Sequence, residues 1–305
     1  MPTSLPGTFD ASAFSADRFI LDVGDRTLDG RPGAPDGPGA HLMGILNVTP
    51  DSFSDGGRYT AVEDAVSRAA AMRSAGAAII DVGGESTRPG ADPVSEAEER
   101  DRVIPVIQAL AERVPDAIVS VDTYKSGVAD AALEAGAHIV NDVTGLRHDP
   151  AMAEVAADHG APVILMHSVN EPGALTEAPS YDDVLDAVVR SLADAIERAE
   201  AAGIEHVVTD PGFGFGKSVT ENLRLVNRID RLLGLGRPVL VGVSRKSTIG
   251  AVLGTDDAPR PVDERLHGSL GATAVAVLRG ATFVRTHDVA ATADLLRVWH
   301  ATVQA

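Results

Sequence analysis

Short apolar segments alternate with segments of helical periodicity along most of the chain. The apolar segments predict strands at residues 42–48, 78–82, 118–122, 138–142, 163–167, 206–210, 239–244 and 282–287. Segments with the period of an amphipathic helix follow them, at 61–75, 95–114, 125–135, 150–159, 181–202, 220–233, 265–279 and 289–303. The pattern therefore predicts eight strand–helix units in succession.

Eight parallel strands, each followed by a helix, in about 260 residues predict an α/β fold, the (β/α)₈ or TIM barrel. A doubly wound open sheet is the alternative, but the units are regular and the chain has no dinucleotide-binding fingerprint. Residues 1–40 lie outside the pattern: 18–24 can form a short strand, and the Pro/Gly-rich stretch 30–39 is typical of a loop or linker. We therefore expect a short N-terminal extension over 1–40 and one barrel domain over 41–305.

Polar residues stand at the ends of the predicted strands rather than at their starts. In a parallel barrel these ends meet on one face, which is where active sites lie. The residues in such positions include Asn47, Asp122, Asn141, His167, Asp210, Ser244, Lys246, Arg285 and His287. The pattern therefore predicts a functional site at the carboxyl ends of the strands.

Asn47 is the candidate metal ligand. Asp51, Ser52 and Asp55 follow it in the same loop, and amide, carboxylate and hydroxyl oxygens suit Mg²⁺. A hydrogen-bonded turn is the alternative for such a composition. Considered with the other motifs, the metal interpretation is favoured.

Two groups of residues are typical of anion binding. The run 83–90, GGESTRPG, contains glycines, whose backbone N–H groups can approach an anion. It also contains a hydroxyl donor and the guanidinium of Arg88, which can bind phosphate or carboxylate through two hydrogen bonds. Arg285 and His287 alternate on the last predicted strand, so their side chains are expected on one side. A phosphate site near the last strands of a barrel fits this pair.

Asp122, Asn141 and Asp210 are candidates for binding a heterocycle, because two carboxylates and an amide can face several ring donors. Taken alone, each aspartate is also a common helix N-cap. Lys246 follows the seventh predicted strand and can act as a charged hydrogen-bond donor or, if it loses its proton, form a Schiff base. For His167 a hydrogen-bonded structural role is more plausible than metal binding, since no second ligand stands at metal spacing.

Composition excludes several classes of function. A net charge of −18 argues against nucleic acid as a partner, and the absence of cysteine excludes a thiol nucleophile or a disulfide framework. No signal peptide or membrane-length apolar run is apparent, so we expect a soluble protein, most simply a cytoplasmic one. Of the twenty-six basic residues only Lys125, Lys217 and Lys246 are lysines, which suggests sites that a planar guanidinium would not fit.

Two runs carry a family resemblance: 44–57, GILNVTPDSFSDGG, and 210–217, DPGFGFGK. Together with GGESTRPG and the Ser244–Lys246 tripeptide, they resemble the signature segments of the dihydropteroate synthases, a pterin-binding family, over the whole barrel. The resemblance implies pterin contacts from Asp122, Asn141, Asp210 and Lys246. It further implies contacts to diphosphate and Mg²⁺ from Asn47, Thr87, Arg285 and His287, and to p-aminobenzoate from Phe53, Arg88, Pro89, Phe215 and Ser244.

The reaction implied by the resemblance joins dihydropterin diphosphate to p-aminobenzoate and releases diphosphate. Asp122, Lys246, Arg285 and His287 would be the catalytic residues, Mg²⁺ the cofactor, and a homodimer the expected assembly. Two departures from the family pattern are small: Ser168-Val169-Asn170 follows His167, and Thr286 replaces a common valine. A pterin-binding methyltransferase barrel and a non-catalytic synthase homologue remain as alternatives.

Overall fold

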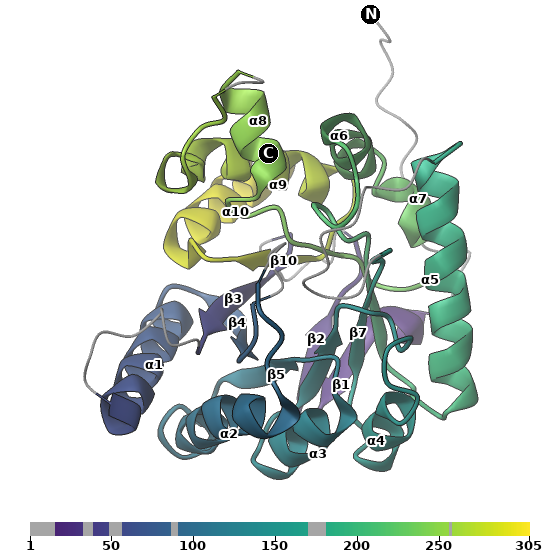
Figure 1. Ribbon diagram of the computed structural model, residues 1–305. Coiled ribbons are helices and arrows are strands. Elements are labelled where there is room, and N and C mark those ends of the chain that lie inside the picture. Colours follow the sequence, from purple (N-terminus) through teal and green to yellow (C-terminus); the bar gives the residue numbers. More distant parts are fainter. Residues whose placement is uncertain (1–15, 33–38, 49–56, 87–90, 170–180, 256–257) are drawn as a thin grey trace, which may run out of the picture.

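Eight parallel strands form the centre of the molecule (Figure 1). The computed structural model describes residues 16–32, 39–48, 57–86, 91–169, 181–255 and 258–305. The barrel strands are β3 (His41–Asn47), β4 (Ala77–Gly83), β5 (Ile118–Asp122), β6 (Ile139–Asp142), β7 (Val163–Met166), β8 (Val207–Asp210), β9 (Leu240–Val241) and β10 (Phe283–Thr286). The predicted (β/α)₈ barrel is confirmed.

The strands follow one another around the barrel in chain order, and β10 returns to pair with β3. The last gap, between β8 and β9, is bridged by a parallel contact of Thr209 with Val239. The backbone N–H of Thr209 also donates to the carbonyl of Pro238 at 2.9 Å. Because all strands run the same way, their carboxyl ends lie on one face of the barrel, the mouth.

Helices surround the strands (Figure 1). They are α1 (Gly57–Ser74), α2 (Glu96–Arg113), α3 (Ser126–Glu134), α4 (Met152–Asp158), α5 (Val184–Ala201), α6 (Val219–Asn227), α7 (Asp230–Leu233), α8 (Ser247–Leu253), α9 (Leu266–Leu278) and α10 (Val289–Val303). Short 3₁₀ turns are η2 (Ala16–Phe19) and η4 (Val262–Glu264). Within the described residues, no helix is both long and apolar enough to cross a membrane.

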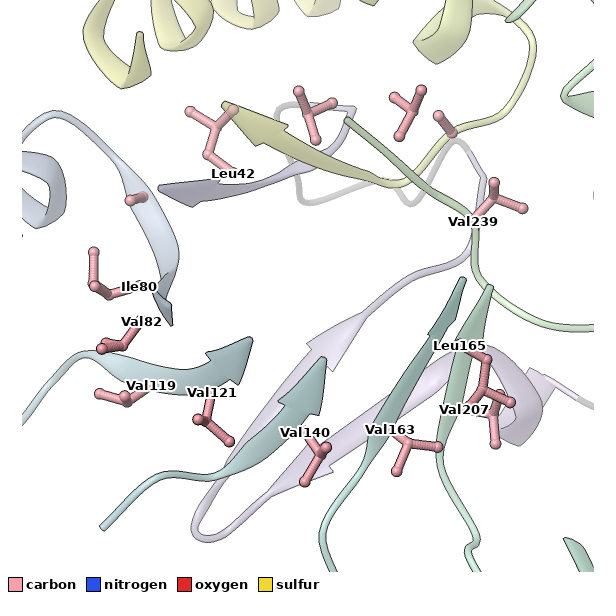
Figure 2. Packing of buried hydrophobic residues seen from close by; sticks show 14 of the residues in the cluster. Leu42, Ile80, Val82, Val119, Val121, Val140, Val163, Leu165, Val207 and Val239 are labelled. Carbon is pink, nitrogen blue, oxygen red and sulfur yellow. The ribbon is translucent and has the colours of Figure 1, made fainter. Parts of the chain in front are cut away.

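Side chains that point away from the barrel axis form the larger core, between strands and helices. Figure 2 shows members of this cluster on neighbouring strands, among them Val82, Val121, Val140, Val163 and Val207. β-branched side chains suit strands that are covered on both faces. Burial of this apolar layer is what holds the helices against the barrel.

A second core fills the barrel itself. One apolar residue from each strand contributes to it: Met43, Ile79, Ile118, Ile139, Ile164, Val208, Leu240 and Phe283. Leu21, Val23 and Leu28 of an antiparallel hairpin, β1 (Ile20–Val23) and β2 (Arg26–Asp29), pack into the same cluster. Since these residues stand near the strand starts, the hairpin covers the end opposite the mouth.

Three histidines at the strand starts attach this hairpin to the barrel. His41 Nε2 contacts the carbonyl of Asp29 at 2.9 Å, and His206 Nδ1 contacts the carbonyl of Ile20 at 2.9 Å. Nε2 of His138 lies 3.4 Å from a guanidinium nitrogen of Arg26. These histidines therefore belong to the closure of the barrel.

The structure differs from the sequence pattern in four places. The strand predicted at 239–244 is shortened to Leu240–Val241. The strand predicted at 18–24 is only the first arm of the hairpin, and β2 was not predicted. The helix predicted at 220–233 is broken into α6 and α7 at Arg228, whose backbone leaves the helical region with φ of −127°. Helix α8 and η4 lie between β9 and α9, where the sequence indicated only connecting chain.

Candidate active site

The residues predicted for the site come from five strands and from the turn after β9, and they meet at the mouth. Asn47, Asp122 and Asp210 each form the last residue of a strand, β3, β5 and β8. Asn141 lies in β6 and Arg285 in β10. Alternate side chains along a strand point into the barrel, and the others point toward the helices. These polar residues stand two or four positions after the apolar residues of the inner core, so their side chains point the same way and lie above that core.

Asp81 of β4 connects several of these side chains and is fully buried. Its Oδ1 accepts a hydrogen bond from Ser120 Oγ at 2.6 Å, and its Oδ2 accepts one from Asn141 Nδ2 at 3.2 Å. Oδ2 also accepts from Nε of Arg285 at 2.6 Å. Asp81 was not predicted as a site residue, although a carboxylate inside the apolar strand Ala77–Gly83 needs a buried partner and was a usable signal.

Arg285 joins Asp81 to Asp122. Its Nη2 donates to Oδ2 of Asp122 at 2.6 Å, and its side chain is 21% exposed. Burial alone would lower the pKa of Arg285, but the carboxylates of Asp81 and Asp122 hold that pKa above its usual value. Burial raises the pKa of Asp122 to about 7, against the opposing effect of Arg285. The guanidinium is therefore a fixed positive charge held between two carboxylates.

The loop after β8 depends on glycine. Gly212 has φ of +67°, and a Cβ atom there would lie 1.9 Å from the carbonyl oxygen of His167. Gly214 has φ of +84°, and its Cβ would lie 3.0 Å from Cδ of Lys246. Only glycine combines this backbone with such close approach. The glycines of the predicted signature run thus let this loop pack against β7 and Lys246.

Lys246 lies over this loop. Its Nζ donates to the carbonyl of Phe213 at 2.5 Å and stands 4.5 Å from the centre of the Phe215 ring. Burial lowers the pKa of Lys246 to about 8, although Asp210 opposes this effect. Burial also raises the pKa of Asp210, which accepts the backbone N–H of Gly212 at 2.7 Å. The ammonium of Lys246 and the carboxylate of Asp210 therefore interact electrostatically at the mouth.

Lys217 has a different position from Lys246. Its Nζ donates to the carbonyls of Gly212 at 2.8 Å and Phe215 at 2.9 Å, and it is only 9% exposed. Burial lowers the pKa of Lys217 to about 7. A compact ammonium closes the loop in a space that a planar guanidinium would not fit.

Ser244 connects the turn after β9 to the end of β10. Its Oγ lies 3.1 Å from Nδ1 of His287 and accepts the backbone N–H of His287 at 3.2 Å. His287 lies next to Thr286, whose hydroxyl faces Thr292 at 3.2 Å and thus away from the mouth. Ser244 and His287, which follow the neighbouring strands β9 and β10, therefore stand as a pair.

Asn47 carries donor chemistry that suits a magnesium ion. A Cβ atom at Gly83 would lie 3.6 Å from Oδ2 of Asp122 and 3.8 Å from Oδ1 of Asn47. An amide oxygen and a carboxylate are hard donors of the kind that Mg²⁺ prefers, although this carboxylate oxygen also accepts from Arg285. Among the described residues no three His, Asp or Glu side chains gather as a metal site. A single protein ligand, completed by water and substrate oxygens, is compatible with Mg²⁺.

A buried ion cluster lies beside the mouth, at the ends of β4 and β5. Lys125 donates to Glu85 and, at 2.5 Å, to Glu99 of α2. Glu85 also accepts the hydroxyl of Tyr124 at 2.8 Å and the backbone N–H of Val94 at 3.2 Å. Its carboxylate therefore ties together the two sides of the segment that joins β4 to α2.

His167 is buried, with 4% of its surface exposed. Burial lowers its pKa to about 3, and the charge of Lys217 acts in the same direction. Its Nδ1 has no hydrogen-bond partner in the described part of the chain, so the expectation of a fully hydrogen-bonded histidine is wrong for this nitrogen. A neutral imidazole is the form that this environment favours.

Four predicted site residues, Phe53, Thr87, Arg88 and Pro89, lie outside the described residues. The other predicted residues stand at the mouth, and the roles assigned to them stay predictions. The described residues at the mouth offer two carboxylates, two amides, an ammonium, a guanidinium and an imidazole. Such an arrangement can bind a polar heterocycle and an anion side by side.

Comparison with known proteins gives a consistent result. Residues 43–287 match the family described as pterin binding enzyme. The chain is 49% identical over 267 residues to the dihydropteroate synthase of Escherichia coli strain K12, covering 87% of this chain and 92% of the relative.

Solved structures agree. The Xanthomonas albilineans dihydropteroate synthase with 4-aminobenzoic acid superposes with a TM-score of 0.84 at 46% identity, covering 94% of this chain and 99% of that one. The Yersinia pestis dihydropteroate synthase in a sulfonamide drug complex superposes with a TM-score of 0.83 at 43% identity, covering 94% of this chain and 100% of that one.

Proposed function

Because the chain belongs to the pterin binding enzyme family, we propose that the barrel mouth is where it joins a pterin to p-aminobenzoate. The protein is a transferase of the dihydropteroate synthase type. It moves the pterinylmethyl group of dihydropterin diphosphate to the arylamine, which gives 7,8-dihydropteroate and diphosphate. The observation that carries the site assignment is the meeting of Asp122, Asp210, Lys246 and Arg285 at one end of the barrel.

The pterin ring binds deep in the mouth. Asp210 accepts hydrogen bonds from the ring N–H groups, and Asn141 can both donate and accept beside it. Lys246 donates from the opposite side. The amide of Asn141 is held by Asp81, so its orientation is set before the substrate arrives.

The diphosphate binds above Arg285 and His287. Two nitrogens of Arg285 are engaged by Asp81 and Asp122, which leaves other N–H groups to contact the anion. A cation that is already oriented needs no rearrangement as negative charge develops on the leaving group. His287 and Thr87 supply further donors to the same anion.

Asn47 would hold Mg²⁺ through its amide oxygen, and the ion when bound would help to neutralise the diphosphate charge. The remaining ligands would be water and diphosphate oxygens. The carboxylate of Asp122 stands beside this space.

The chemical step is a substitution at the pterin methylene carbon. The C–O bond to diphosphate breaks and its electron pair leaves with the oxygen, while the amine nitrogen forms the new C–N bond. The proton that the nitrogen then loses goes to the released diphosphate or to water. Asp122 stabilises the positive charge that develops on the pterinylmethyl group. No side-chain nucleophile takes part, which agrees with a chain that contains no cysteine.

p-Aminobenzoate binds at the outer part of the mouth. Phe215 and Ser244 line its pocket, and the family resemblance assigns Phe53, Arg88 and Pro89 to contacts with the same substrate. Holding the amine in line with the leaving group while excluding water would supply much of the rate enhancement.

A homodimer is the proposed assembly, through a surface on α6, α8 and α9. These neighbouring helices expose apolar side chains: Val219, Leu223, Val252, Leu253, Val275 and Leu278. A patch of this kind is typical of a protein–protein interface. Sedimentation should give a dimer for the native protein and a monomer for Val252→Asp/Leu278→Asp.

We also place the protein in the cytoplasm, with no nucleic-acid or membrane partner.

The test is incubation of the purified protein with dihydropterin diphosphate and p-aminobenzoate, with and without Mg²⁺. Dihydropteroate and diphosphate should form in equal amounts, and EDTA should abolish both. Folded protein that forms no product with both substrates and metal would exclude the function. Product that forms equally in EDTA would exclude the metal assignment alone.

A further inference from the structure

Arg245 stands between two proposed substrate contacts in a conformation that arginine rarely adopts. Its φ is +58°, and Leu146 is the other described residue besides glycine with a positive φ. This left-handed backbone is unfavourable for a residue with a Cβ atom, and it persists only where surrounding contacts hold it. Such positions are often found at functional sites.

Four contacts hold the residue in place. The backbone N–H of Arg245 donates to Ser269 Oγ at 2.9 Å, and its carbonyl accepts from Nη1 of Arg265 at 3.0 Å. Its side chain forms a bidentate ion pair with Asp288: Nε donates to Oδ2 at 2.9 Å, and Nη2 donates to Oδ1. Arg245 is thus fixed to α9 through its backbone and to the residue before α10 through its guanidinium.

The left-handed residue determines where its neighbours lie. On one side Ser244 reaches Nδ1 of His287 at 3.1 Å, and on the other Lys246 reaches the carbonyl of Phe213 at 2.5 Å. A return of Arg245 to negative φ would rotate the chain. Ser244 would then move away from His287, or Lys246 away from the carbonyl of Phe213. The strained residue therefore keeps both side chains at the mouth.

Asp288, which lies between β10 and α10, is the partner of Arg245 on the other side of this contact. It follows His287 directly, and its backbone N–H donates to Oγ1 of Thr286 at 3.1 Å. Its carboxylate does not cap α10, although the residue stands at the N-cap position. The side chain is thus engaged by Arg245 rather than by its own helix.

We propose that Arg245 and Asp288 are a positioning pair, which holds the turn after β9 against the end of β10. The pair acts through Ser244, Lys246 and His287, and it rests on the proposed function of those residues. Its loss misplaces the donors for the pterin and the diphosphate. A displacement near 1 Å can cost about a hundredfold in rate.

The experiment compares Asp288→Asn, Arg245→Ala, Arg245→Gly and the Asp288→Asn/Arg245→Ala double variant. The control is Asp230→Asn, which removes another bidentate pair, with Arg228, outside the mouth (3.1 and 3.2 Å). For each variant kcat, both KM values and the melting temperature are measured. Crystal structures of the native protein and Asp288→Asn report φ at residue 245 and the Lys246–Phe213 distance.

We expect Asp288→Asn and Arg245→Ala each to lower kcat by at least about tenfold. The double variant should lose no more than the worse single variant, because both changes break one interaction. Arg245→Gly should keep more activity than Arg245→Ala, since glycine adopts positive φ without strain. Asp230→Asn should keep native kcat at a comparable loss of melting temperature.

Several outcomes would overturn the pair. Native kcat in Asp288→Asn would do so, as would an Arg245→Gly variant no more active than Arg245→Ala. A loss confined to the Arg245 variants would mean that Arg245 contacts substrate itself. If the native protein proved inactive, the proposed function would fail. In that case the crystal structures still test the pair. If φ at residue 245 and the position of Lys246 are the same in Asp288→Asn as in the native protein, the positioning role is refuted.

Discussion

Arg285 donates through Nε to Oδ2 of Asp81 at 2.6 Å, and these residues lie 204 positions apart in the chain. The acceptor is fully buried on β4, and the donor is the cation proposed to bind diphosphate. Asp81 also accepts from Asn141 and Ser120. One carboxylate thus orients the proposed contacts for the anion and for the pterin.

Asp81→Asn should weaken both the fold and the reaction. An amide has one acceptor oxygen, so its N–H₂ group would face donors on Ser120, Asn141 or Arg285. We expect the free energy of unfolding to fall by about 2–3 kcal/mol and kcat/KM to fall at least about tenfold. Denaturant unfolding and steady-state assays measure the two effects. Asp294→Asn, at an exposed carboxylate paired with Arg297, is the control and should leave both unchanged. Native activity in Asp81→Asn would show that Arg285 does not depend on it.

Asp210→Asn should lose affinity for the pterin. The substitution replaces an acceptor oxygen by a donor, which leaves polar groups mismatched in a buried site. The cost should be about 1–3 kcal/mol of binding free energy, measured by calorimetry with a pterin alone. Asp130→Asn changes an exposed carboxylate on α3 and is the matched control. Equal pterin affinity in the two variants would count against the assignment of Asp210.

Activity should fall on the alkaline side as Lys246 loses its proton. Burial lowers the pKa of Lys246 to about 8, so kcat/KM, which reports the free enzyme, should decline above that pH. Lys246→Arg should lose most activity because the site is shaped for an ammonium. Its residual activity should show no decline near pH 8. Lys217→Met tests the other lysine with a lowered pKa, since an alkaline decline that disappears there would belong to Lys217 instead.

Borohydride should leave Lys246 unmodified in the presence of both substrates. Neither substrate offers an aldehyde or ketone that an amine could capture, so no imine is available for reduction. Mass spectrometry of the digested protein is the measurement. A reduced adduct on Lys246 would require a covalent mechanism and would replace the one given above.

Stability should fall in mild acid because burial lowers the pKa of several histidines, His41 among them. Burial lowers the pKa of His41 in the folded protein, whereas the unfolded chain takes up the proton near pH 6.5. The stabilisation is therefore complete above about pH 6.5 and is lost as the pH falls through that value towards the folded pKa. The slope due to His41 is at most about 1.4 kcal/mol per pH unit. His41→Gln should flatten the dependence in denaturant titrations between pH 7 and 5, and an unchanged slope would exclude a contribution from His41.

Salt should stabilise the fold. A net charge of −18 on a compact molecule is self-repulsive, and the Debye length falls from about 8 Å at 0.15 M to about 3 Å at 1 M salt. Surface ion pairs such as Arg224 with Asp183 weaken in the same range, but each contributes little. The melting temperature should therefore rise with KCl between 0.05 and about 1 M. A constant or falling melting temperature would show that the ion pairs outweigh the repulsion.

Residue spacing along the chain was enough to predict the order of the strands and helices and the face on which the site lies. Strand and helix periods are local properties, so the eight units could be read from residue spacing, and the parallel arrangement then brought Asp122, Asp210 and Arg285 to one end. The family resemblance, carried by the runs 44–57 and 210–217, is confirmed by the match over residues 43–287. Local signals also marked Lys217 and Lys246, although they did not separate a loop anchor from a residue at the mouth.

Which side chains share a partner could not be predicted from the chain and depends on the folded barrel. The Asp81–Arg285 contact depends on the registers of β4, β3 and β10 across the closed barrel, and no local period specifies a register between distant strands. The hairpin β1–β2 is equally non-local, because Leu21 and Leu28 are buried only where eight strand starts surround them. The positive φ of Arg245 follows from contacts with Ser269 and Asp288, since arginine has no intrinsic preference for that backbone. The types of residue at the mouth are thus a property of the chain, whereas their pairing is a property of the closed barrel.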